Sequence, residues 1–244
     1  MKSILSFILS LSCIFNYAQS YENGNQLITA MHYAYAGKFY KYMSFSQNMT
    51  YYNNDTVSRK DIWHEVAEFP GTLSIKFKTK DSKKGVMFKD HQIYSFSEKG
   101  MKKGDKRVHE LLLLGMDVYF YKPEYTCHIL DSLGFNLNQI TMNTYNNRPV
   151  YIVGAQSNDT TSNQFWIDAE RLYLHRIINK SNNNISDTQF DNYVEMDNNW
   201  VAKTVRFKIN GKLVLVEDYY DIKLPKKLNP DYFNPDKFVE SKFE

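Results

Sequence analysis

Apolar and polar positions alternate along most of this chain, a pattern that predicts short β-strands. In the run 40–52, Met43 and Phe45 share one face with other apolar side chains, whereas Ser44 and Ser46 share the opposite face. This alternation assigns Met43 and Phe45 to the interior of a sheet. Runs of the same kind, bounded by turn residues, predict further strands at 62–69, 72–78, 84–89, 92–97, 138–145, 149–155, 164–168, 172–180, 187–196, 200–209 and 212–222.

Three segments interrupt this pattern with the features of helices. Residues 23–38 carry apolar side chains at helical spacing, and Gly37 offers a stop at the end of that run. Residues 107–120 contain four consecutive leucines without β-branching, which favours a helix over a strand. Residues 124–133 are expected to form a second piece of helix after it, ending before a glycine.

The order of these elements predicts a mainly β fold with helices, of the α+β class. About eleven strands cannot lie flat as one open sheet without curling. The pattern therefore predicts a curved, unclosed antiparallel β-barrel with helices in its concave face. Asn210-Gly211 is the strongest hairpin signal, because both residues tolerate positive φ. Residues 101–106 are expected to form a lysine-rich loop, and 225–244 a polar, turn-rich tail. No linker of low complexity divides the chain, so residues 21–244 are expected to form one domain.

The first twenty residues have the features of a secretory signal peptide. Lys2 precedes an apolar run over 4–15, and small residues follow near position 20. That run is too short to cross a bilayer, which requires ~20 apolar residues. Residues 1–20 are therefore interpreted as a signal peptide, and the mature chain is expected to begin at or near Tyr21, outside the cytoplasm.

Lipidation at Cys13 is an alternative for the same segment, since a lipoprotein signal ends in a cysteine that becomes acylated. The sequence before Cys13 has serine where a branched apolar residue is usual, and cleavage there would leave a very short apolar core. Cys127 is the remaining cysteine of the mature chain. It is interpreted as a small buried hydrophobe rather than a reactive thiol.

Catalytic, metal-binding and nucleic-acid-binding patterns are not found in the sequence. A net charge of +3 is too small to attract nucleic acid, and the six histidines form no closely spaced metal-ligating pair. Asp168 and Glu170 have the spacing of a glycosidase pair on one strand face, but a solvated strand end is the preferred interpretation. The sequence therefore predicts no enzyme, no metal and no cofactor. The lysines between Lys78 and Lys84 favour a solvated hairpin, with a patch for anionic headgroups or nucleic acid as the alternative.

Short motifs along the chain resemble those of bacterial lipoprotein-localisation carriers (LolA/LolB-like proteins) and their outer-membrane lipoprotein-sorting relatives. They are Phe45-Ser46-Gln47, the strand Leu73–Phe77 after a Pro-Gly pair, and the hairpin Phe88–Phe96, where a histidine replaces the glycine of the family's turn. The hairpin Phe165–Arg176 and the closing segment Asp231–Pro235 resemble the relatives as well. No motif here places the arginine that the carriers use beneath their helices.

The resemblance implies a half-barrel with an apolar concave face that holds acyl chains. It implies an exported protein, periplasmic or associated with the outer membrane, that binds or carries a lipid, an acyl chain or a lipoprotein, with peripheral membrane contact left open. A monomer is expected. The alternatives are a non-enzymatic structural or interaction module whose hollow is permanently plugged by helices and, least favoured, a hydrolase. Leu111, Leu112 and Leu114 are expected on a helix packed into the concave sheet beside Phe45 and Trp166, at ~1.5–3 kcal/mol for each buried side chain. The candidate cavity residues are Met43, Phe45, Leu111, Leu112, Leu114 and Trp166.

Overall fold

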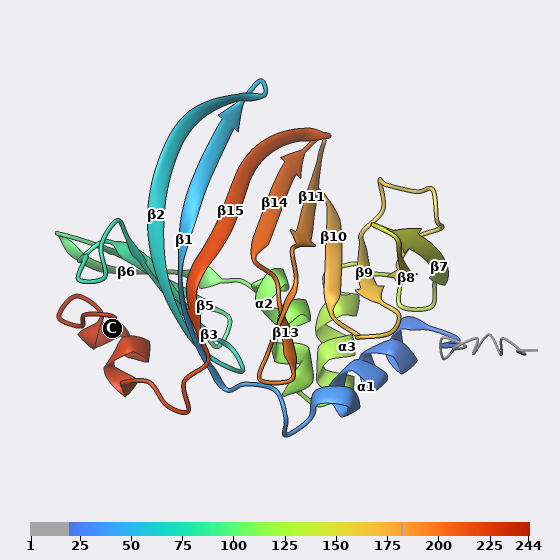
Figure 1. Ribbon diagram of the computed structural model, residues 1–244, viewed down its shortest axis with the longest axis horizontal. Coiled ribbons are helices and arrows are strands. Elements are labelled where there is room, and N and C mark those ends of the chain that lie inside the picture. The colour runs from blue at the N-terminus through green and yellow to red at the C-terminus, as the bar shows by residue number, and fades with distance from the viewer. Residues whose placement is uncertain (1–19, 182) are drawn as a thin grey trace, which may run out of the picture.

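A long, strongly curved antiparallel sheet dominates the molecule (Figure 1). The structure is a computed structural model that describes residues 20–181 and 183–244. Within these residues, thirteen strands form the sheet, and two more form a separate short ribbon. The sheet contains β1 (Tyr42–Asn53), β2 (Thr56–Glu68), β3 (Thr72–Phe77), β4 (Gly85–Lys89), β5 (Gln92–Ser97), β6 (Gly100–Lys106), β7 (Ile140–Tyr145), β8 (Arg148–Val153), β9 (Gln164–Asp168), β10 (Leu174–Ser181), β11 (Asn184–Asp191), β14 (Thr204–Ile209) and β15 (Lys212–Lys223). The ribbon is β12 (Val194–Met196) and β13 (Asn199–Val201).

Two meanders joined at the middle of the sheet account for its strand order, β6-β5-β4-β3-β2-β1-β15-β14-β11-β10-β9-β8-β7. Strand β1 begins the first meander, and the last strand, β15, returns to pair with it, so that Gln47 lies opposite Tyr219. The hairpin between β14 and β15 turns at Asn210 and Gly211, with φ of 50° and 78°. These positive angles confirm the turn that the Asn-Gly pair predicts.

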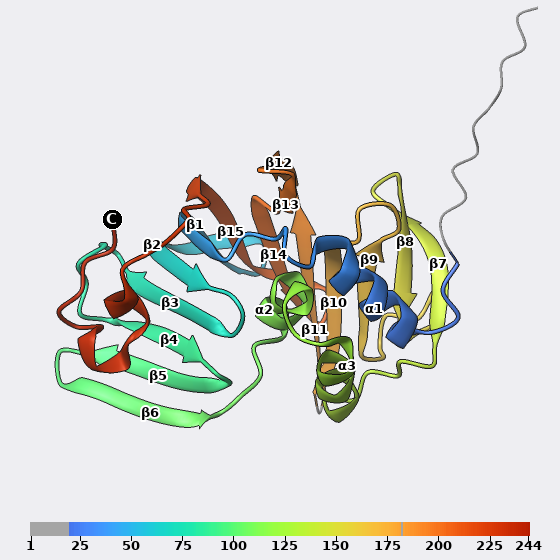
Figure 2. The same ribbon diagram turned by 90° about the horizontal axis from the view of Figure 1, so that it is seen from below.

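The helices lie in the hollow of this sheet (Figure 2). They are α1 (Gly24–Tyr35), α2 (Glu110–Gly115), the single turn η1 (Asp117–Tyr119) and α3 (Pro123–Ser132). Helix α1 begins where the Asn23 side chain accepts a hydrogen bond from the Gln26 backbone N–H at 3.0 Å. Its buried side chains pack with those of α3 and of strands β8 and β9 in the largest apolar cluster.

The observed fold confirms the predicted class, a mainly β fold whose antiparallel sheet is curved and does not close. The predictions for two kinds of segment were wrong. Residues 101–106, expected as a loop, belong to edge strand β6, which is exposed on both faces and so shows no apolar alternation. The predicted strands 187–196 and 200–209 each divide in two, because Asn192 adopts positive φ and the ribbon β12–β13 leaves the sheet there.

The C-terminal tail covers part of the convex face of the sheet. Two short turns, η2 (Pro230–Phe233) and η3 (Pro235–Lys237), bring aromatic side chains against strands β2, β4 and β5. Lys76 of β3 is fully buried there, and its Nζ donates to the carbonyls of Ser82 and Phe238, each at 2.7 Å. Burial lowers the pKa of Lys76 to about 8.

Among the described residues, no helix has both the length and the hydropathy needed to cross a membrane. The signal peptide predicted over residues 1–20 lies outside the described part of the chain, apart from Ser20, and so does Cys13.

Candidate functional site

An apolar cavity of about 300 Å³ lies in the concave face, between the first meander and helix α2. Strands β1, β2, β3, β4 and β15 supply its floor, and helix α2 covers one side. Apolar side chains make up most of its wall, which is the composition expected of a site for an apolar ligand. The lining residues are Met43, Phe45, Trp63, Glu65, Ala67, Phe69, Leu73, Ile75, Val86, Phe88, His109, Leu111, Leu112, Met116, Phe190, Phe207, Leu215, Glu217 and Tyr219.

Four of the six side chains that the sequence nominates for the cavity line it: Met43, Phe45, Leu111 and Leu112. The prediction that Met43 and Phe45 face inward agrees with this placement. The leucine-rich segment is helical and lies on the concave side, as predicted.

The remaining two, Leu114 and Trp166, do not reach the cavity. Leu114 is fully buried among the side chains of α1 and the second meander, because a helix with four successive leucines is apolar on every face. Trp166 packs instead with Val150 and Ile152 in a cluster separate from the helices. All five residues of β9 are buried, so alternation in that strand cannot show which face is concave. The expected contact of Trp166 with the leucine helix was therefore wrong.

Ser44 and Ser46 lie on the face opposite the cavity, as their alternation with Met43 and Phe45 predicts. They are not exposed, however, because the C-terminal tail brings Phe243 beside them. The Ser46 hydroxyl lies 2.7 Å from Nδ1 of His64 on the neighbouring strand. The outer face at this point is therefore a second packed layer.

Polar side chains interrupt the apolar floor of the cavity at Glu65, Glu217 and Tyr219, and Gln47 lies on β1 between the two strands that carry them. Gln47 Nε2 donates to Glu65 Oε1 on β2 at 2.6 Å. On the other side of β1, the Tyr219 hydroxyl donates to Glu217 Oε2 at 3.2 Å, both on β15. The amide oxygen of Gln47 is buried without a hydrogen-bond partner among the described residues. We call Gln47, Glu65, Glu217 and Tyr219 the polar floor.

Both carboxyl groups of the polar floor are held in an environment that opposes their ionisation. Burial raises the pKa of Glu217 to about 8, with the Tyr219 hydrogen bond acting in the opposite direction. Burial also raises the pKa of Glu65 well above its usual value, and the neighbouring Glu217 raises it further. The cavity wall therefore disfavours the charged form of both acids.

His109 brings a third titratable group to the cavity wall. Its Nδ1 accepts the backbone N–H of Leu112 at 3.2 Å and so caps helix α2. Burial, together with nearby Arg107, lowers the pKa of His109 to about 4. The imidazole is therefore neutral, with its proton on Nε2.

Strand alternation could have located the polar floor, although the sequence analysis did not assign it. Trp63, Glu65 and Ala67 share one face of β2, and Leu215, Glu217 and Tyr219 share one face of β15. A carboxyl group between apolar neighbours on one strand face is the signal that points to a buried acid.

One hydrogen bond ties the helical segment over the cavity to the sheet. Oδ1 of Asp117, which follows helix α2, accepts the backbone N–H of Gly71 in the turn between β2 and β3 at 2.9 Å. Asp117 is buried, and burial raises its pKa to about 7. Gly71 has φ of 85°, and a Cβ there would lie 2.8 Å from the Tyr121 hydroxyl. Glycine is therefore required at this contact.

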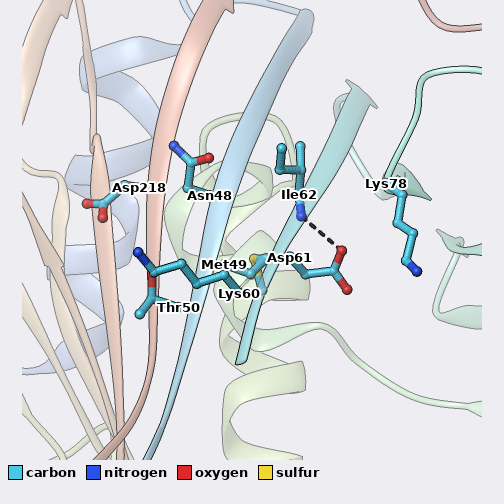
Figure 3. A pocket seen from close by; sticks show the side chains of 8 residues that line it. All are labelled: Asn48, Met49, Thr50, Lys60, Asp61, Ile62, Lys78 and Asp218. Atoms are coloured by element: carbon cyan, nitrogen blue, oxygen red, sulfur yellow. Dashed lines mark hydrogen bonds between the residues drawn. The ribbon is translucent and has the colours of Figure 1, made fainter. Parts of the chain in front are cut away.

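A second hollow, of about 610 Å³, lies near the other ends of β1, β2 and β15 (Figure 3). Its wall is mostly polar and exposed, with Asn48, Lys60 and Asp218 among the residues drawn. The hydrogen bond in Figure 3 joins the Ile62 backbone N–H to Asp61 Oδ1 at 2.9 Å. This hollow offers water-exposed surface charges rather than the buried, apolar wall of the cavity.

Asp168 and Glu170, which have the spacing of a catalytic pair, are both bound by Arg148. Nη2 of Arg148 donates to Asp168 and to Glu170, at 2.9 Å in each case. Burial would raise the pKa of Asp168, but hydrogen bonds from Arg148 and His175 hold it well below its usual range. Asp168 is fully buried rather than solvated as predicted, and its full set of partners marks a structural ion pair.

Within residues 20–181 and 183–244, no cluster of three or more His, Cys, Asp or Glu side chains could hold a metal ion. Cys127 is half-buried on α3, and burial together with Glu124 raises its pKa to about 11. A thiol with so high a pKa is a poor nucleophile, in agreement with the interpretation of Cys127 as a packing residue.

Several solved structures have the same fold at very low sequence identity. A DUF1329 family protein from Desulfovibrio piger is 12% identical, with a TM-score of 0.60 over 86% of this chain and 95% of that one. A LolA superfamily protein from Nitrosomonas europaea is 11% identical, with a TM-score of 0.55 over 87% and 98%. An outer-membrane lipoprotein-sorting protein domain from Vibrio parahaemolyticus is 12% identical, with a TM-score of 0.57 over 88% and 98%.

These similarities define the class of fold, which is LolA/LolB-like, as the sequence motifs predict. No family model matches the sequence, and no curated protein matches it. At 11–12% sequence identity, these similarities show the fold and do not identify a ligand.

Proposed function

We propose that this chain is an exported protein that binds or carries a lipid or another apolar ligand in the cavity between the first meander and helix α2. The observation that carries the proposal is the cavity itself, about 300 Å³ in volume and lined mainly by apolar side chains. That volume lies at the lower end of the ~300–1,000 Å³ typical of ligand pockets. One acyl chain or a small apolar molecule is the occupant that this volume favours.

The fold supports the same proposal. The lipoprotein-sorting domain and the LolA superfamily protein share this architecture along nearly their whole length. An exported location, in the periplasm or at the outer membrane, is the compartment in which such a carrier would operate. This location also agrees with the signal peptide predicted from the first twenty residues. N-terminal sequencing of the exported protein should begin at or near Tyr21, and a chain that retains Met1 would contradict export by this route.

A substitution that fills the cavity tests the proposal directly. Met43 is fully buried and lines the cavity from β1. Met43→Trp should therefore weaken uptake of a neutral fluorescent probe such as Nile red by about tenfold or more. If the cavity is open to the probe, Met43→Trp should have nearly the melting temperature of the parent. If the site is already fully packed, Met43→Trp should lower the free energy of unfolding by roughly 1–3 kcal/mol.

Asn48→Trp is the matched control, because Asn48 lies on the same strand but is exposed on the opposite face. Ser44 is unsuitable for this purpose, since the C-terminal tail buries it. Binding lost in Met43→Trp and kept in Asn48→Trp supports the carrier. A parent protein that takes up no probe, together with a destabilised Met43→Trp, would instead favour a plugged structural module.

A further inference from the structure

The polar floor of the cavity has two carboxyl groups and no lysine or arginine. The Gln47 amide N–H and the Tyr219 hydroxyl already donate to Glu65 and Glu217. What remains directed to the cavity are the two carboxyl groups of Glu65 and Glu217, both of which line it. A ligand that reaches this floor therefore meets two carboxyl groups, which accept hydrogen bonds strongly once they are ionised.

Among the described residues, no positively charged side chain neutralises this floor from within the cavity. The lining contains no lysine or arginine. The remaining titratable groups of the wall are His109, which is neutral and caps α2, and the Tyr219 hydroxyl, which is bonded to Glu217. Arg107, beside His109, is exposed. Two buried carboxyl groups without a counter-ion are costly, and such groups are ordinarily paired in a folded protein.

The strand register brings the three acceptor-bearing side chains together across β1. Glu65 lies opposite Phe45, Glu217 lies opposite Met49, and Gln47 occupies the position between them on the same strand face. The ring of Phe45 also packs on that of Tyr219, with centroids 4.6 Å apart, at the edge of the polar floor. Aromatic faces beside carboxylates favour a cation.

We propose that the ligand of this cavity is an amphiphile with a protonated amine, whose N–H groups bind the carboxyl groups of Glu65 and Glu217 while its hydrocarbon part occupies the apolar wall. This inference rests on the proposed function and specifies its ligand class. A protonated amine supplies hydrogen-bond donors and a positive charge together, and both stabilise the ionised form of a carboxyl group that burial otherwise disfavours. A fatty-acid anion would instead place a third acid in the cavity, and a neutral alcohol would supply a donor without the charge.

Three ligands of equal chain length separate these cases: dodecylamine, dodecanol and dodecanoic acid. Each is titrated against the parent protein loaded with Nile red, at about pH 7 and below the concentration at which the amphiphiles aggregate. Dodecylamine should displace the probe at a concentration about tenfold lower than dodecanol, and dodecanoic acid should be the weakest of the three. If dodecanol or dodecanoic acid binds as tightly as the amine, the inference is wrong while the apolar carrier stands.

The isosteric double variant Glu65→Gln with Glu217→Gln assigns the preference to the polar floor. It should bring dodecylamine to within about twofold of dodecanol. Asp218→Asn is the matched control, since Asp218 is exposed on the outer face of β15 next to Glu217. A preference for the amine that survives in the double variant overturns the assignment. Should the double variant fail to fold, the order of the three ligands on the parent protein still decides the matter. A parent that binds neither Nile red nor any of the three ligands contradicts the proposed function and this inference together.

Discussion

The two halves of the concave face are covered in different ways. Over β8 to β10, helices α1 and α3 fill the hollow, and side chains such as Ile28, Leu130 and Phe165 are fully buried. Over β1 to β4 and β15, cover comes from the short helix α2, and a cavity of about 300 Å³ remains beneath it. One continuous sheet thus carries a filled half and a hollow half.

The buried acids of the two halves also differ, in their hydrogen-bond partners and in the direction of their pKa shifts. Asp168, in the filled half, is paired with Arg148 and His175, which hold its pKa below its usual range in spite of burial. Glu65 and Glu217, in the hollow half, each receive one hydrogen bond, and burial raises the pKa of both. Asp168 thus has the charged partners of a structural ion pair, whereas among the described residues no charged side chain pairs with Glu65 or Glu217.

Replacing one phenylalanine by alanine in each half should give the largest difference in stability between the filled half and the hollow half. Phe165→Ala leaves a void in the helix-filled core, where Phe165 packs on Phe135, and should lower the free energy of unfolding by about 3–5 kcal/mol. Phe45→Ala enlarges a hollow that already exists and should cost about half as much. Chemical denaturation measures both, and equal losses would show that the two halves are packed alike.

The second-largest expected effect is a pH dependence of stability that arises from Glu217 in the hollow half. The Glu217 carboxyl has an unfolded pKa near 4.5 and a folded pKa of about 8, raised by burial. Between these values the folded state keeps a proton that the unfolded state has released, so stability falls as the pH rises through that window. Glu217→Gln removes this loss and should be more stable than the parent above pH 8 by an amount on the order of 2–4 kcal/mol.

Denaturation of both proteins at several pH values measures that difference. Asp218→Asn, on the outer face of the same strand, should follow the parent at every pH. If the difference in stability between Glu217→Gln and the parent does not vary with pH, Glu217 does not have a raised pKa in the folded state.

A smaller effect is expected at the contact that holds α2 over the hollow half. Asp117→Ala removes the acceptor of the Gly71 N–H and should cost about 1–3 kcal/mol, while Asp117→Asn keeps an acceptor oxygen and should cost less. In hydrogen exchange, the amides of α2 should exchange faster in Asp117→Ala, with those of α1 unchanged. Equal acceleration in α1 and α2 would mean that the helices open as one unit.

The sequence predicts which face of a strand is buried only where apolar and polar positions alternate clearly. In β1 the apolar and polar positions are distinct, so Met43 and Phe45 are assigned correctly to the interior. In β9 every side chain is buried, and Trp166 could not be assigned to a face from its neighbours. Edge strand β6 is exposed throughout and has no apolar periodicity from which to predict it.

Long-range contacts account for what the sequence does not reveal. The tail segment with Phe238 and Phe243 reads as polar and turn-rich, yet it buries Lys76 and covers Ser44 on a distant strand. The polar floor also depends on pairing between the first strand and the last, which brings Glu217 to the side of β1 opposite Glu65. Local propensity carries no information on such pairing.

Photo-crosslinking with an alkyl chain that bears a diazirine tests the central claim, that the hollow half binds an apolar ligand, most directly. The protein is saturated with this probe and irradiated, and the modified residues are mapped by mass spectrometry. We expect the crosslinks at cavity residues such as Met43, Phe69 and Leu112, with few or none in α1 or β9. An excess of unlabelled chain should abolish them. Crosslinks confined to the outer surface, or spread equally over both halves, would contradict the account.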